Sequence, residues 1–194
     1  MFYIEIKKYI LIMILLVPVG ISYGWDNRRE GFILGGGFGP GLTNYRMEFD
    51  ETSQREENKE LKYSIYMSFI IGYAPSNKLL LYFNDKENVV KAKSENGDEV
   101  FTFDDLLSFG ASYYLKESSP SLFFSGGIGF SAWEAKDCKD QKGFGAFTGI
   151  GYEFSRHWSV DLSLKYNNLT SDTGNPKLKT QTFSVSASVN LLGF

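Results

Sequence analysis

The stretch Trp158–Tyr166 (WSVDLSLKY) alternates strictly between apolar and polar residues. A two-residue period places the apolar side chains on one face of an extended strand and the polar ones on the other. In the preceding stretch, Gly143–Phe154 (GFGAFTGIGYEF), large side chains share one face; the other is mostly glycine, with Glu153 and, as its one bulky member, Phe147. A face of glycine and acid suits the crowded interior of a narrow barrel whose apolar face contacts lipid. These stretches predict a transmembrane β-barrel.

The beginning of the chain has the features of an export signal. Lys7 and Lys8 precede the apolar run Ile10–Val17, which is too short to cross a bilayer as a helix, and small residues favour cleavage after Gly24. We expect residues 1–24 to be a signal peptide, with an uncleaved N-terminal anchor as the alternative. A chain of 194 residues with net charge −3 is most simply one domain. We therefore assign residues 25–194 to a single outer-membrane barrel.

The alternation recurs along the chain and predicts an all-β, eight-stranded antiparallel up-and-down barrel. The expected strands are Gly31–Thr43, Leu61–Ala74, Lys78–Asn84, Phe101–Lys116, Leu122–Ala132, Gly143–Phe154, Trp158–Tyr166 and a last strand that follows the loop 171–179. Long polar loops at 44–60, 85–99, 134–142 and 171–179 alternate with tight turns at 75–77, 117–121 and 155–157. Outer-membrane barrels have short periplasmic turns and longer outer loops, so this order indicates a periplasmic N-terminus.

Aromatic residues are expected at both borders of the lipid-facing surface. The outward stretch from Tyr63 to Tyr73 covers 11 residues, which matches the length that a tilted transmembrane strand needs. We expect a periplasmic girdle of Tyr73, Tyr113, Phe154 and Trp158, and an outer girdle of Tyr45, Tyr63 and Tyr166.

The glycine-rich first strand Gly31–Gly41, the eight-strand pattern, the export signal and the final Phe194 together resemble the small OmpA-like, OmpX-like and opacity-type outer-membrane barrels. The resemblance covers residues 31–194 and is one of pattern. It implies that Phe194 is an assembly signal read by the barrel-assembly machinery through the C-terminal strand. Phe194 does not share the parity of Phe183 and Leu191. Either a bulge near Leu191 shifts the phase, or Phe194 lies beyond the strand.

Five charged residues are expected to point into the lumen: Asp104, Lys116, Glu153, Asp161 and Lys165. Side chains fill the interior of an eight-stranded barrel, and buried charges are paired or hydrated. We therefore predict a polar network that plugs the lumen; a narrow proton or ion path is the weaker alternative. The strand count excludes a porin for large solutes.

Other candidate chemistry has little support in the sequence. Gly35, Gly36, Gly37 and Gly39 form no dinucleotide or phosphate-loop signature, so no cofactor is expected. Cys138 is the only cysteine and lies in a charged loop, which excludes an internal disulfide and gives no metal site. No basic face supports nucleic-acid binding.

His157-Trp158-Ser159 resembles the His-x-Ser of outer-membrane lipid A deacylases, which use a serine–histidine pair. Here Val160 replaces the Asn that follows the serine in that motif, and the turn is expected on the periplasmic side, away from the outer leaflet. A catalytic residue is therefore not assigned.

The function that these observations indicate is an integral outer-membrane barrel with a plugged polar lumen and four surface loops, acting in envelope structure or surface interaction. The alternatives are a conduit for a small hydrophobic ligand, a lipid A-modifying enzyme, and a soluble lipocalin-like carrier. The expected location is the outer membrane of a Gram-negative-type bacterium. The expected partners are outer-membrane lipid, lipopolysaccharide and the barrel-assembly machinery. The outer loops either only face solvent or bind an extracellular ligand of unknown identity.

Overall fold

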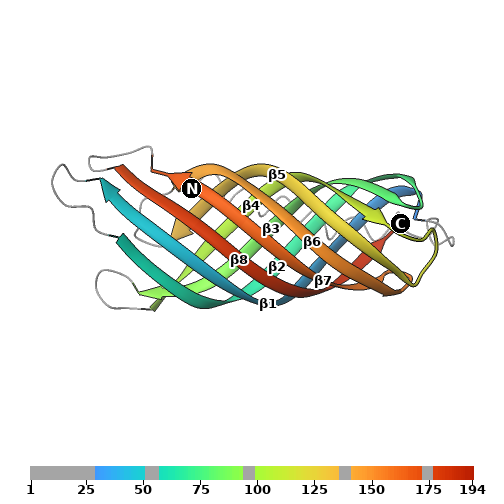
Figure 1. Cartoon of the computed structure of the whole chain (residues 1–194), viewed down its shortest axis with the longest axis horizontal. Coiled ribbons are helices and arrows are strands. Elements are labelled where there is room, and N and C mark those ends of the chain that lie inside the picture. The colour runs from blue at the N-terminus through green and yellow to red at the C-terminus, as the bar shows by residue number, and fades with distance from the viewer. Residues whose placement is uncertain (1–28, 51–56, 94–98, 136–140, 172–176) are drawn as a thin grey trace.

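The computed structural model describes residues 29–50, 57–93, 99–135, 141–171 and 177–194, which form one closed barrel (Figure 1). The eight strands are β1 (Gly31–Asp50), β2 (Glu57–Ser76), β3 (Leu79–Lys93), β4 (Glu99–Tyr114), β5 (Ser121–Ala135), β6 (Gln141–Ser155), β7 (Trp158–Thr170) and β8 (Lys177–Gly193). No helix in these ranges is long and apolar enough to cross a membrane. The predicted signal peptide and Cys138 lie outside the described residues.

Each strand pairs antiparallel with its neighbour in sequence, and β1 pairs with β8 to close the sheet. Following paired residues once around the barrel from Gly37 leads back to β1 at Met47, ten residues further along. Such a stagger requires strands that tilt against the barrel axis, as Figure 1 shows. The fold class predicted from the sequence is confirmed.

The outer face of the barrel is apolar. Phe38, Tyr63, Ile128 and Phe144 expose 68%, 88%, 73% and 68% of their surface, although each belongs to a paired strand. A chain that folded in water would turn such side chains inward, whereas a band of them around a closed sheet fits contact with lipid. The inward face carries the small and polar residues, so the predicted orientation of the two faces is confirmed.

The aromatic residues follow the prediction with one exception. Tyr63, Tyr73, Tyr113, Phe154, Trp158 and Tyr166 are all exposed on the outer face. Tyr45, expected in the outer girdle, is 8% exposed and packs inside the barrel against Trp133, with ring centroids 5.6 Å apart. The prediction for Tyr45 is wrong because β1 continues through this position in regular alternation, and Tyr45 shares the inward parity of Thr43.

Most of the strands are longer than the sequence predicted. Most of the loop expected at 85–99 belongs to β3, which continues to Lys93, and Asn44–Asp50 extend β1. The predicted loop 134–142 is shortened from both sides, because β5 continues to Ala135 and β6 begins at Gln141. The predicted loop 171–179 is shortened from one side, because β8 begins at Lys177. The backbone hydrogen bonds between strands do not depend on an apolar outer face. Strands can therefore continue through charged residues where they extend beyond the lipid. The three tight turns lie within two residues of their predicted positions, at residues 77–78, 115–120 and 156–157.

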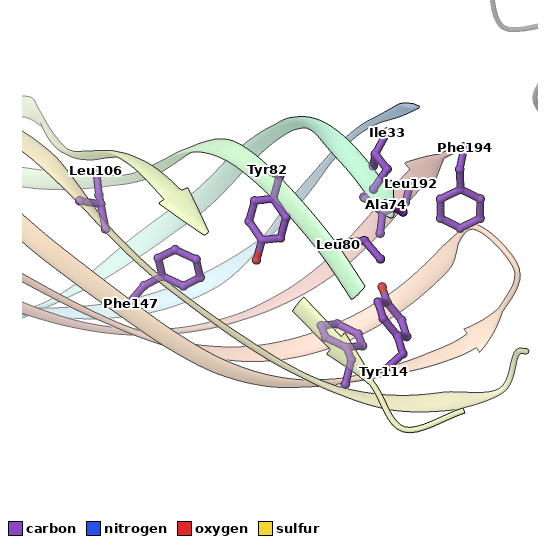
Figure 2. Packing of buried hydrophobic residues seen from close by; sticks show 10 residues of the cluster. Ile33, Ala74, Leu80, Tyr82, Leu106, Tyr114, Phe147, Leu192 and Phe194 are labelled. Carbon is purple, nitrogen blue, oxygen red and sulfur yellow. The ribbon is translucent and has the colours of Figure 1, made fainter. Parts of the chain in front are cut away.

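Ten buried side chains form an apolar cluster that extends from the turn end of the barrel to its middle; nine come from every strand except β7, and the tenth is the C-terminal residue. They are Ile33, Ala74, Leu80, Tyr82, Leu106, Tyr114, Phe123, Phe147, Leu192 and Phe194, of which Figure 2 labels nine. A smaller cluster of Tyr45, Trp133 and Leu169 lies near the loop ends of β1, β5 and β7. Apolar and aromatic side chains therefore fill part of the lumen, in addition to the polar residues that the sequence predicted there.

The C-terminal residue lies beyond the last strand. β8 ends at Gly193, and the buried positions Asn190, Leu192 and Phe194 keep an unbroken alternation. Phe194 is 7% exposed, and its ring lies 5.1 Å from that of His157. The second explanation for its parity is thus confirmed, and the ring faces the interior rather than lipid.

Candidate functional site: the barrel lumen

The structure places four of the five predicted charged residues on the inner face. Asp104, Glu153 and Lys165 are buried, and Asp161 is half-buried. Lys116 is exposed, and its predicted inward position is wrong. The reason is that β4 ends at Tyr114, so Lys116 belongs to the β4–β5 turn, where strand parity no longer sets the direction of a side chain.

Asp104 and Lys165 form an ion pair in the half of the lumen nearer the loops. Lys165 Nζ lies 3.1 Å from Asp104 Oδ2, and both side chains are at most 3% exposed. The ammonium also donates to the carbonyl oxygens of Asp104 and Lys86. Such a pair is stable in low dielectric only when further hydrogen bonds satisfy the remaining lone pairs and protons.

Neutral donors from two other strands complete the shell of the Asp104 carboxylate. Asn167 Nδ2 donates to Oδ1 at 2.8 Å, and the hydroxyls of Thr182 and Ser184 donate at 3.1–3.3 Å. Ser184 in turn lies 2.9 Å from Thr43 on β1. We call Asp104, Lys165, Asn167, Thr182 and Ser184 the upper layer; it ties β4, β7 and β8 together across the lumen.

Arg29 closes the opposite end. Its guanidinium makes a bidentate contact with Glu153, at 2.9 Å from Nε to Oε2 and 2.7 Å from Nη2 to Oε1, with both side chains 3% exposed. Nη1 donates to the carbonyls of Asn77 (2.7 Å) and Lys116 (2.9 Å), in two different turns. The planar group also lies 4.2 Å from the centre of the Tyr114 ring. We call Arg29, Glu153 and Tyr114 the lower layer.

Sequence reasoning missed Arg29 because it precedes the first alternating residue of β1. The signal was present in Glu153: a carboxylate on the inward face of a narrow barrel needs a buried cation, and Arg is the side chain best built for bidentate pairing with it. Sequence reasoning also missed Lys86, because it fell in the predicted loop 85–99.

Lys86 and Asp161 lie between the two layers, beside a cavity of about 30 Å³. Lys86 Nζ donates to Tyr66 Oη at 2.7 Å and lies 4.5 Å from the centre of the Phe147 ring. Asp161 Oδ1 accepts a hydrogen bond from Ser188 Oγ at 2.5 Å. These groups line one part of the cavity, and residues of the buried apolar cluster line the rest.

The His157–Ser159 pair does not have the geometry of a nucleophile and its base. His157 Nδ1 lies 2.7 Å from the Leu192 carbonyl oxygen, and the residue adopts φ +95° in the β6–β7 turn. Ser159 is buried on the inner face, and among the described residues its hydroxyl has no hydrogen-bond partner. A serine nucleophile needs a base within hydrogen-bond reach. In the same ranges, no three His, Cys, Asp or Glu side chains gather as they would around a metal ion.

A family model described as outer membrane protein beta-barrel domain matches residues 78–190, more than half of the chain. The chain belongs to this outer-membrane β-barrel family. The match covers strands β3 to β7 and nearly all of β8, and it agrees with the closed barrel and its apolar exterior. Comparison with curated proteins gave no match.

Several solved outer-membrane barrels have a similar fold. The chain is 14% identical to OprG from Pseudomonas aeruginosa (TM-score 0.51), covering 86% of this chain and 97% of OprG. It is 14% identical to Neisserial surface protein A (TM-score 0.52; 84% and 97% covered) and 15% identical to outer membrane protein AlkL (TM-score 0.51; 86% and 92% covered). At these identities the likeness shows the barrel fold, and the function has to come from the residues of this chain.

Proposed function

We propose that this outer-membrane barrel has a lumen closed to solutes and acts in envelope structure or in surface interaction through its outer loops. The observation that carries the proposal is that paired charges cross the lumen at two levels. Arg29–Glu153 does so at the turn end, and Asp104–Lys165 does so nearer the loops. Each pair is bonded to several strands or turns, so neither moves without breaking several hydrogen bonds.

The same arrangement gives little support to the alternative functions. A conduit for a hydrophobic ligand needs an apolar passage, whereas the apolar part of this lumen is filled by the side chains of its own cluster. A lipid A-modifying enzyme needs an activated nucleophile, whereas the buried Ser159 hydroxyl has no hydrogen-bond partner among the described residues that could act as its base. The proposal is therefore non-enzymatic.

The proposal includes export and assembly. Residues 1–24 are a signal peptide that is removed on export, and the chain is inserted into the outer membrane of a Gram-negative-type bacterium next to lipopolysaccharide. Phe194 is read by the assembly machinery before the barrel closes, because in the folded chain it is covered by the His157 ring.

Ion flux into lipid vesicles that contain the refolded protein tests the closed lumen. We expect the wild-type barrel to be as tight as vesicles without protein. The double variant R29A/K165M, which removes one side chain from each layer, should admit ions. A matched double variant, K62M/K78A, removes two lysines with partly exposed side chains and should stay tight. Sustained ion or sugar flux through the wild-type barrel would contradict the proposal.

Comparison of cells with and without the gene addresses the role. Under the proposal, loss of the gene changes membrane integrity or the binding of molecules at the cell surface, and the mass spectrum of lipid A stays the same. A changed lipid A mass that the Ser159→Ala variant also shows would favour the enzyme instead. Failure to take up a hydrophobic compound without the gene would favour the conduit.

A further inference from the structure

A cavity of about 30 Å³ lies inside the barrel between the upper and lower layers, and both apolar and polar side chains line it. Its floor is made by Leu80, Tyr114 and Phe123, which belong to the apolar cluster at the turn end, and Figure 2 shows Leu80 and Tyr114 there. Its walls include the polar side chains of Ser68, Lys86, Ser159, Asp161 and Asn190. The cavity thus has apolar side chains on one side and polar side chains on the other.

Lys86 brings a positive charge to this cavity. The residue is 4% exposed, and among the described residues Tyr66 is the one side chain that accepts a hydrogen bond from its ammonium, at 2.7 Å. On another side the ammonium faces the Phe147 ring at 4.5 Å. An ammonium has three N–H donors, and within the described ranges no carboxylate forms an ion pair with this one. Burial of a charge in this state is costly unless something else solvates it.

Asp161 brings the opposite charge to the same cavity. Its side chain is half-buried and accepts one hydrogen bond, from Ser188 Oγ. Like Lys86, Asp161 forms no direct ion pair with another described residue. In particular, its carboxylate and the Lys86 ammonium are not in contact. The two charges therefore share a space without touching each other.

Three further polar atoms around the cavity lack partners in the described part of the chain. They are Ser68 Oγ, Ser159 Oγ and Asn190 Nδ2. Ser159 and Asn190 are only 2% and 5% exposed, so bulk solvent does not satisfy them. Buried polar groups in folded proteins almost always have a hydrogen-bond partner, and ordered water supplies it where protein does not.

We propose that this cavity is a binding site for a small cluster of ordered water that links the Lys86 ammonium to the Asp161 carboxylate. One water needs roughly 10–15 Å³ of such space, so the cavity has room for about two. Water suits both charges because it donates to Asp161 and accepts from Lys86. A bound anion would be repelled by Asp161, and a bound cation would be repelled by Lys86.

This site gives the lumen a property beyond closure to solutes. This inference rests on the proposed closed lumen and places a water-separated ion pair between its two layers, with the charges solvated by site water and by the Tyr66 and Ser188 hydroxyls. The Lys165 ammonium differs, because it contacts its carboxylate directly and uses two backbone carbonyls as well. The two buried lysines thus serve as matched probes of wet and dry ion pairing within one protein.

Magnetization transfer from water, measured by NMR on the wild-type protein in lipid, tests the proposal directly. We expect transfer to the Lys86 ammonium and to the Asn190 side-chain amide, and much weaker transfer to the Lys165 ammonium. Absence of transfer to both Lys86 and Asn190 would overturn the proposal. A saturable shift of the Asn190 amide on titration with chloride or sodium would also overturn it, since an ion would then occupy the site.

A double-variant cycle tests the link between the two charges. In K86M or D161N alone, one charge stays buried without its partner, and we expect the folding equilibrium constant to fall about tenfold or more. In K86M/D161N, the loss should be smaller than the product of the two single losses. Independent single effects would show that the water does not couple Lys86 to Asp161. Because the NMR measurement uses the wild-type protein, the proposal stays falsifiable if a variant fails to fold.

Discussion

Removal of the Lys165 ammonium is expected to destabilise the barrel strongly. In Lys165→Met, the Asp104 carboxylate keeps its place at 0% side-chain exposure but loses the cation 3.1 Å away. Breaking a buried ion pair by removing one partner costs about 3–5 kcal/mol. Asn167, Thr182 and Ser184 still donate to the carboxylate, which places this variant near the lower end, at about 3 kcal/mol. That is a large part of a typical unfolding free energy of about 5–15 kcal/mol.

Urea unfolding of the refolded protein in lipid vesicles, followed by tryptophan fluorescence, measures this loss. The matched control is Lys62→Met. Lys62 pairs with Glu60 at 2.8 Å, but these side chains are 29% and 52% exposed, and exposed pairs contribute only about 0–1 kcal/mol. If Lys165→Met shifts the urea midpoint no more than Lys62→Met does, the Asp104–Lys165 pair does not hold the lumen together, and the reasoning fails.

Three further outcomes follow from the structure. In Gly39→Ala, the new Cβ would lie 2.0 Å from a carbonyl oxygen of β8, so we expect the unfolding free energy measured in urea to fall by about 1–3 kcal/mol. In the control Gly126→Ala, the nearest atom to the new Cβ is 3.5 Å away, and the loss should be far smaller. Equal losses would contradict the close packing of β1 on β8. Ile128→Arg places a charge in the apolar outer band and should lower stability in lipid by about 2–4 kcal/mol; unchanged stability there would mean that this face does not contact lipid. Phe194→Ala should reduce the fraction of folded, heat-modifiable barrel recovered from cell membranes. The control Phe154→Ala removes an exposed aromatic ring at the same end of the barrel and should leave this fraction unchanged. Equal recovery of the two variants would show that Phe194 is not an assembly signal.

The sequence predicted the strands best where they cross the lipid. There, the outer face has to be apolar and the inner face small or polar, so a strand such as Trp158–Tyr166 is visible from its own residues. The prediction failed for Asp85–Lys93 and for Asn44–Asp50, which are strands with charged residues. Above the lipid the outer face meets water, and the alternation that reveals a strand is lost although the hydrogen-bonded ladder continues.

The lumen was predicted less completely than the exterior. Asp104, Glu153, Asp161 and Lys165 were found because each lies on a strand with clear alternation. Lys116 was misplaced because the strand had already ended at Tyr114. The partner of Glu153 was missed because Arg29 belongs to no strand, and it reaches the lumen only because the chain enters the barrel at the turn end.

By itself, the sequence determined which face of each strand meets lipid, how many strands there are and at which end the short turns lie. These properties depend on neighbouring residues, because alternation and turn length are local. Only the tertiary structure decided which inward side chains meet. Arg29 and Glu153 are 124 residues apart, and the ten-residue stagger of the closed sheet sets the height at which residues of distant strands face each other. The pairing of charges inside the barrel depends on that stagger, which no single strand encodes.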